Sequence, residues 1–273
     1  HEVSFGNDYQ REEEGRERRV RSAFTVAQRD KVYYDPDDGG IRDVDGEDID
    51  DRMNYVRYGP QLSARQSGDK LSFGTDLKAQ LWDYEDVQVV SEYDHEYFLL
   101  GGNVQYKFAP SSLLRLTVEK SSRRYSSRPS FDLDGNQLVT NPALRYDYLE
   151  YGLLARQRIT DDIWFGFGYE LMDRQDRYLG YNDFTRYSYT FEFHWSPGRR
   201  FDLELETSYR DYDYPNAFAF HEPVAGPKPL KTLDAEIFAT WRISRHFRLV
   251  AEIDRRATVG VGVGVGVQVK CDL

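Results

Sequence analysis

The sequence predicts an all-β protein, a single antiparallel up-and-down transmembrane β-barrel of about 12 strands. Three observations support this fold class. Apolar and polar residues alternate with a period of two in many segments, short polar turns alternate with long connections, and charged residues recur on the polar side of the alternation. A period of two places successive side chains on opposite faces of a strand. Each segment therefore has one apolar and one polar face.

The clearest segment is FDLELETSYR, residues 201–210, where Phe201 and Leu203 face one way and Asp202 and Glu204 the other. Similar segments predict strands of about the 9 to 11 residues that a tilted strand needs to cross a bilayer. In chain order, the strands are expected at 22–33, 55–65, 71–82, 98–108, 114–120, 148–158, 163–174, 186–196, 201–210, 233–244, 247–254 and 259–269.

The last of these segments is unusual because valine and glycine alternate from Val259 to Val267. Glycine weakens a strand interior, so we expect pairing on both sides to compensate. Residues 259–269 are predicted to close the barrel, with valines on the lipid face and the segment 22–33 as neighbour. An altered terminus without functional meaning is the alternative explanation.

The connections between the predicted strands alternate in length. Short turns are expected at 67–70, 109–112, 160–162, 196–200 and 244–246, and longer excursions at 35–51, 83–96, 121–143, 174–185 and 211–229. This rhythm places all short turns on one side of the sheet, as in transmembrane barrels. Residues 20–273 are predicted to form the barrel domain. Residues 1–19 are highly charged and lack a periodic apolar face, so they are predicted to be an N-terminal extension, either a short helix or an arm.

Composition excludes several classes of protein. The mean hydropathy of −0.73 is too low for a helical membrane protein, and no run of 18 apolar residues occurs. A net charge of −11 argues against nucleic-acid binding. The single cysteine, Cys271, excludes an internal disulfide framework and a cysteine-rich metal site. We expect no metal, no cofactor and no nucleic-acid partner.

Alternation alone does not decide between a transmembrane barrel and a soluble all-β protein. The connection lengths favour the membrane, and so do tyrosines near the long loops, such as Tyr55, Tyr58, Tyr146 and Tyr187, which resemble an interfacial girdle. Many charges then lie on the polar face. We expect the following residues to line a hydrated lumen: Arg156, Arg158, Glu170, Arg174, Glu192, Glu204, Glu206, Arg210, Asp234, Glu236, Arg242, Arg248, Glu252 and Asp254.

With this pattern, residues 20–273 resemble the Gram-negative outer-membrane β-barrel class, in a porin-like form. The resemblance implies a bacterial outer-membrane location, an even number of strands and both termini in the periplasm. It also implies contact with outer-membrane lipid and lipopolysaccharide. The chain departs from the class in ending in Leu273, where such proteins usually end in an aromatic residue.

The expected function is a channel for passive or weakly selective passage of small hydrophilic solutes, and not an enzyme. Acidic residues concentrate in the last strands and basic ones in the middle strands, which predicts either a transverse field across the lumen or ordinary salt-bridge packing of the wall. One alternative is a non-conducting scaffold or export component of an envelope complex, with residues 1–19 reaching a periplasmic partner. The translocator end of an autotransporter is another alternative.

Two further features of the sequence suggest catalysis or calcium binding, but neither pattern is complete. His194 and Ser196 lie two residues apart, as in outer-membrane phospholipases, but no third residue to orient them is identifiable. The acidic segments 35–51 and FDLDGN, residues 131–136, lack the ligand spacing of a calcium-binding loop. Both are predicted to be turns in which aspartate, asparagine and glycine provide backbone freedom, with adventitious binding of a divalent cation by the segment 35–51 as the alternative.

Overall fold

The computed structural model describes residues 1–13, 15–29, 43–44, 47–48, 54–85, 93–109, 111–198, 200–218, 230–242, 248–258 and 261–272. For 43–44, 47–48 and 248–272 it describes the backbone only. Thirteen strands form one antiparallel sheet, with neighbours in the order of the chain, and β3 and β4 form a separate hairpin. Among these residues, no helix has the length and apolar character needed to span a membrane.

The strand bounds are β1 Glu2–Glu13, β2 Arg16–Arg29, β3 Asp43–Val44, β4 Glu47–Asp48, β5 Tyr55–Ser67, β6 Leu71–Tyr84, β7 His95–Ala109, β8 Ser112–Pro129, β9 Ala143–Thr160, β10 Ile163–Asp176, β11 Phe184–Trp195, β12 Phe201–Asp213, β13 Leu230–Arg242, β14 Arg248–Thr258 and β15 Val261–Asp272. Each of the 12 segments expected from period-two alternation overlaps one strand of the large sheet. The all-β, antiparallel and up-and-down predictions are therefore confirmed.

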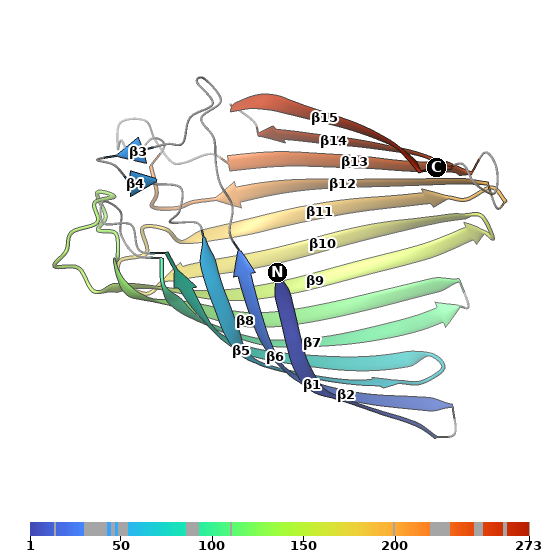
Figure 1. Cartoon of the computed structure of the whole chain (residues 1–273), viewed down its shortest axis with the longest axis horizontal. Coiled ribbons are helices and arrows are strands. Elements are labelled where there is room, and N and C mark those ends of the chain that lie inside the picture. Colours follow the sequence, from blue (N-terminus) through green and yellow to red (C-terminus); the bar gives the residue numbers. More distant parts are fainter. Residues whose placement is uncertain are drawn as a thin grey trace.

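The connections place short turns along one rim of the sheet, here called the turn rim, and longer segments along the other, the loop rim (Figure 1). Two residues separate β9 from β10, for example, whereas 13 residues, 130–142, separate β8 from β9. The exception is the loop-rim end of β14 and β15, where only two residues of sequence separate the strands. The predicted rhythm is otherwise confirmed.

The N-terminal segment differs from the expectation of a helix or an arm. Residues 2–13 form β1, which pairs along its full length with β2, from Glu2 opposite Ala27 to Glu13 opposite Arg16. Its alternation is present but weak, because Asn7 interrupts the apolar positions Val3, Phe5 and Tyr9. Backbone pairing with β2 thus outweighs the poor side-chain pattern.

The predicted closure of the barrel is not found. The sheet ends in β1 on one side and β15 on the other, β2 pairs with β1 and β5, and the described part of β15 pairs with β14. The prediction that 259–269 pair with 22–33 is wrong, because β1 occupies that edge of β2. Glu2 lies at the loop rim and Asp272 at the turn rim, so the start of β1 and the end of β15 lie on opposite rims, which differs from the expectation that both termini lie on one side of the membrane.

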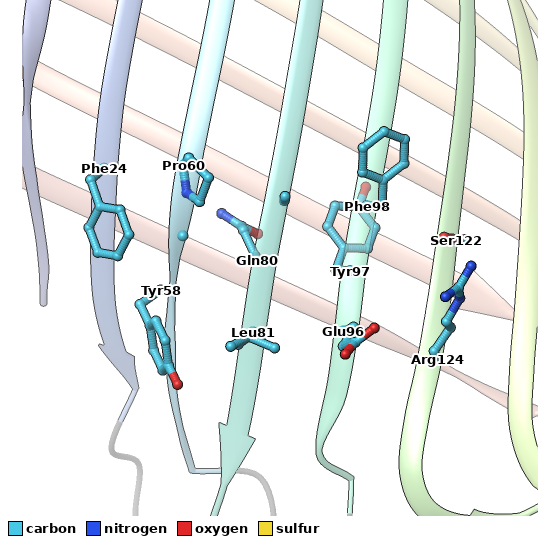
Figure 2. Close-up of a pocket in the computed structure, with 12 residues that line it drawn as sticks. Phe24, Tyr58, Pro60, Gln80, Leu81, Glu96, Tyr97, Phe98, Ser122 and Arg124 are labelled. Carbon is cyan, nitrogen blue, oxygen red and sulfur yellow. The ribbon is translucent and has the colours of Figure 1, made fainter.

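The sheet curls strongly, so that its first strands lie across from its last strands (Figure 1). Figure 2 looks at the first strands from outside, and strands of the opposite wall cross behind them. We call the concave side the inner face and the convex side the outer face. Large apolar side chains such as Leu116, Phe167 and Trp241 stay exposed on the outer face, at 52%, 61% and 52%.

The sheet has a small hydrophobic core at the loop rim instead of one between two layers. Tyr181, Phe184, Tyr214 and Ala217 are buried together, with Met172 packed against them. This cluster joins the connection between β10 and β11 to the segment that follows β12. Most apolar residues of the strands therefore have no protein layer to cover them.

Candidate functional site: the inner face

The 14 charged residues expected to line a lumen all occupy inner-face register positions. Arg156 lies opposite Gly166, Glu192 opposite Glu206, and Glu206 opposite Glu236, so one parity of each strand shares this face. The same rows contain Arg158, Glu170, Arg174, Glu204, Arg210, Asp234 and Arg242, and the β14 positions of Arg248, Glu252 and Asp254.

A two-point ion pair connects strands that are not neighbours in the sheet. Arg156 of β9 donates from Nε and Nη2 to the carboxylate of Glu192 on β11, at 2.7 and 3.0 Å. Gly166 of β10 lies between them in the register. A Cβ atom at Gly166 would lie 2.6 Å from Glu192 Oε2. The missing side chain of Gly166 is what lets the two charged groups meet.

A second charged group, not expected from the sequence, lies nearer the loop rim. Arg186 of β11 donates to Glu150 of β9 at 3.3 Å and contacts Glu170 of β10. All three side chains are at least partly buried. Arg186 was missed because it lies at the start of the predicted strand 186–196, although its parity matches that of Glu192. One arginine thus serves two carboxylates.

The acidic residues of the last strands form a lateral row across the inner face. Glu192, Glu206, Glu236 and the Asp254 position are successive direct partners from β11 to β14. Like charges directly opposite one another destabilise a sheet. Arg156 compensates Glu192, while Arg210 pairs with Asp234 in the adjacent row.

The charge separation expected from the sequence is therefore reduced by ion pairs within the sheet. Arg174, expected among the basic lumen residues, donates to the carbonyl oxygen of Asn182 and stacks over the rings of Tyr146 and Phe184 at 4.6 and 4.3 Å. Glu206 and Glu236 have no ion pair among the described residues. Within the described part of the wall, the negative charges of Glu206 and Glu236 are therefore not compensated by an ion pair.

The glycines of β9 and β10 open a recess in this wall of about 300 Å³. Gly152 and Gly168 contribute no side chains, and Thr117 and Thr190 provide hydroxyl groups beside them. The carboxylate-bearing residues that line the recess are Glu150, Glu170, Glu192 and Glu206, with Arg115 as the lining cation. The recess has the polar surface expected of a hydrated solute or cation site.

An aromatic band follows the loop rim on the inner face. It consists of Tyr55, Trp82, Tyr84, His95, Tyr125, Tyr146 and Tyr148, whose neighbouring ring centroids lie between 4.7 and 6.3 Å apart. The interpretation of Tyr55 and Tyr146 as parts of an outward girdle is wrong, because their parity is that of the inner face. Tyr58 and Tyr187 lie on the outer face as expected.

His194 lies near the turn rim and faces two carboxylates. Its Nε2 is 3.1 Å from Asp202 Oδ1 and 3.9 Å from Glu204 Oε1, and its ring stacks on Trp164 at 5.5 Å. The potential ligand atoms of His194, Asp202 and Glu204 lie within 4.8 Å of one another, which suits a divalent cation. Sequence reasoning paired His194 with Ser196 instead. The Ser196 hydroxyl donates to the carbonyl oxygen of Phe201 at 3.4 Å, in the turn.

The FDLDGN segment is a turn, as predicted. Asp132 Oδ1 accepts hydrogen bonds from the backbone N–H groups of Asp134 and Asn136 at 3.0 and 2.8 Å. The hydrogen bonds from Asn136 are the main reason that the pKa of Asp132 lies below its ordinary value. The carboxylate therefore stabilises the loop backbone. The acidic segment 35–51 lies outside the described residues except for β3 and β4.

No protein-family model matches this chain, and a search of curated proteins finds no match.

Proposed function

We propose that this protein is a bacterial outer-membrane channel through which small hydrophilic solutes pass passively along a charged inner wall. The observation that carries the proposal is the division of one 13-stranded sheet into an exposed apolar outer face and a charged inner face. The strands have 11 to 18 residues in the large sheet, enough to cross a bilayer at a tilt.

The outer face is hard to reconcile with water. Monomeric soluble proteins rarely expose contiguous apolar patches larger than a few hundred Å². Here exposed apolar side chains continue from strand to strand, for example from Val104 on β7 to Leu116 on β8 and Leu153 on β9, which are direct register partners. Hydrocarbon chains would cover this surface along its whole width.

Aromatic side chains on the outer face gather towards both rims. Trp195 packs on Phe201 near the turn rim with ring centroids 5.5 Å apart, and Trp241 lies opposite Phe201. Tyr58 on β5 and Tyr187 on β11 are exposed on the outer face near the loop rim. Aromatic girdles at both interfaces are typical of transmembrane barrels.

Membrane insertion requires that the edges of the sheet be paired, because lipid offers no hydrogen-bond partners to a strand edge. Both β1 and β15 run from the loop rim towards the turn rim. We propose that these two edges meet in the membrane as a parallel pair. Closure would turn the inner face into a lumen.

The inner face supports passage of polar solutes with a weak preference for cations. Glu206 and Glu236 add negative charge to a wall on which Arg156 and Arg210 are already paired. Rings of acidic side chains favour cations in channels. The aromatic band and the bound arginines at the loop rim narrow the entrance and limit the size of the solute.

Planar-bilayer recording of the purified protein tests the channel. We expect stepwise conductance, a reversal potential that indicates cation preference in a salt gradient, and a smaller preference for the Glu206→Gln, Glu236→Gln double variant. Insertion without conductance would refute the channel and favour the non-conducting scaffold. The scaffold proposal no longer has a free N-terminal arm, since residues 2–13 belong to the sheet.

A further inference from the structure

A groove on the outer face, formed by the first strands of the sheet, is apolar with charged residues at one end. It measures about 520 Å³ and crosses β2, β5, β6, β7 and β8 towards the loop rim (Figure 2). This volume falls in the range of about 300 to 1,000 Å³ typical of small-ligand sites. We call it the outer groove.

The backbone explains why the surface is hollow here. Phe24, Pro60, Ala79 and Phe98 follow one another across four strands, so two small residues lie between two large rings. Gly59 has a φ of 155°, and a Cβ atom there would lie 2.0 Å from the carbonyl oxygen of Ala79. Gly59 lets β5 approach β6 closely, and Pro60 donates no backbone hydrogen bond. The hollow therefore follows from the backbone of β5 at these two residues.

The next lateral row towards the loop rim changes from apolar to charged. Tyr58 lies opposite Leu81, Leu81 opposite Glu96, and Glu96 opposite Arg124 (Figure 2). The apolar hollow thus has a guanidinium group and a carboxylate at its loop-rim end.

The positive charge continues beyond the groove along the same outer row. Arg124 lies opposite Arg145 in the register of β8 and β9. Arg145 and Arg177 both pair with Asp147, at 3.5 and 2.5 Å. Three arginines thus lie on this edge of the outer face with the carboxylates of Glu96 and Asp147. Asp83 and Asp94 lie farther towards the loop rim, and Asp94 Oδ1 accepts a hydrogen bond from the backbone N–H of Tyr84 at 2.6 Å. Arginine suits phosphate because its planar fork donates two parallel hydrogen bonds.

We infer that the outer groove binds one lipid with an anionic phosphate headgroup, its acyl chain between Phe24 and Phe98 and its phosphate at Arg124. The inference rests on the proposed membrane insertion, which would put the groove in contact with hydrocarbon. The apolar hollow, its size and the cationic end together match this single class of ligand. The ion pairs of Arg145 and Arg177 with Asp147 keep these two arginines near the proposed phosphate position.

Lipid retention measured by native mass spectrometry tests the inference. Protein reconstituted in mixed phosphatidylglycerol and phosphatidylcholine bilayers is released into detergent, and bound lipids are counted. We expect the wild type to retain one phosphatidylglycerol in at least about tenfold preference over phosphatidylcholine. Both lipids carry the phosphodiester, but only phosphatidylcholine adds a quaternary ammonium group, which the arginines at the loop-rim end of the groove repel.

Two variants remove the two parts of the site separately. Ala79→Leu fills the hollow and Arg124→Gln removes the charge, and each should lower phosphatidylglycerol retention about tenfold or more. Ala155→Leu on the outer face of β9 and Arg18→Gln on the outer face of β2 near the turn rim are matched controls that should retain the lipid. If Ala79→Leu does not fold, Arg124→Gln decides alone.

Equal retention of both lipids, or unchanged retention in Arg124→Gln, would overturn the lipid site. Protein that inserts and conducts but retains no phosphatidylglycerol refutes this inference and leaves the channel intact. Protein that does not insert into the mixed bilayer refutes the proposed function and the lipid site together.

Discussion

Arg156 of β9 and Glu192 of β11 form an ion pair over the intervening strand, with 2.7 Å from Nε and 3.0 Å from Nη2 to the carboxylate. A pair between second neighbours needs an empty position between them, and Gly166 provides it. This contact neutralises the first carboxylate of the acidic row that continues through Glu206 and Glu236. The missing side chain of Gly166 therefore affects how much of the negative charge of the inner face is neutralised.

The coupling between Arg156 and Glu192 should depend on Gly166. A double-mutant cycle with Arg156→Ala and Glu192→Ala should give a coupling free energy of about 0.5 to 1 kcal/mol, because Arg156 is partly exposed and solvent screens the pair. In the Gly166→Ala background the coupling should fall close to zero. Unfolding in denaturant measures all variants, and a coupling that survives Gly166→Ala would contradict the assigned role of the glycine.

Neutralising Arg156 should change ion selectivity. Arg156→Gln leaves Glu192, Glu206 and Glu236 uncompensated, so the reversal potential in a salt gradient should move towards stronger cation preference. Arg18→Gln removes the same charge from the outer face and should leave the reversal potential unchanged. Equal effects of the two variants would mean that the inner face does not contact the permeating ions.

Substituting Phe167, which is 61% exposed, distinguishes a lipid surface from a water surface. Phe167→Lys should destabilise the folded protein in bilayers by about 2 to 4 kcal/mol if the position lies near the midplane. Thr190→Lys on the inner face of β11 should cost much less, because a hydrated wall solvates the new charge. A stable Phe167→Lys protein in lipid would count against membrane contact at this face.

Closure of β1 on β15 can be tested with the single native cysteine. Cys271 occupies an outer-face register position near the turn rim, and Arg11 and Glu13 occupy the corresponding positions of β1. Oxidation should form a disulfide in Arg11→Cys or Glu13→Cys in the membrane, detected as a mobility shift under non-reducing conditions. Glu12→Cys, on the inner face, is the control. Absence of a bridge from both outer positions would argue against this closure.

The turn at Asp132 should lose order in acid. Its pKa lies below the ordinary value of 3.8 because backbone N–H groups of the turn donate to the ionised carboxylate. The lowered pKa means that the stabilisation is fully present above 3.8 and is lost as the pH falls through the lower folded-state value. The amide resonances of Asp134 and Asn136 should titrate with a midpoint below 3.8. Asp132→Asn should abolish this titration; an ordinary midpoint would refute the assignment.

Much of the fold was predictable because strand alternation is a local signal. All 12 expected strands occur, and inner and outer positions such as Glu204 and Leu205 followed from parity alone. Where alternation was interrupted, the prediction was wrong. Asn7 and the charged residues that follow it interrupt the alternation, so the sequence did not predict β1. The formation of β1 depends on pairing with β2.

The candidate site was predictable in part for the same reason. Parity placed Arg156 and Glu192 on one face, but nothing in the sequence brought strands β9 and β11 together across Gly166. Arg186 and the inner orientation of Tyr146 were missed because they lie near predicted strand ends, where the parity was not followed into the loops.

The sequence by itself determined the strands, their two faces and the lengths of most connections, because these depend on residues two positions apart or on short polar segments. Only the tertiary structure decided that β1 and not β15 lies beside β2, that Arg156 reaches Glu192, and that Gly59 and Pro60 form the outer groove. These features depend on register and strand approach between distant segments. Period-two alternation is the same for every register that keeps the faces aligned, so it does not select among them.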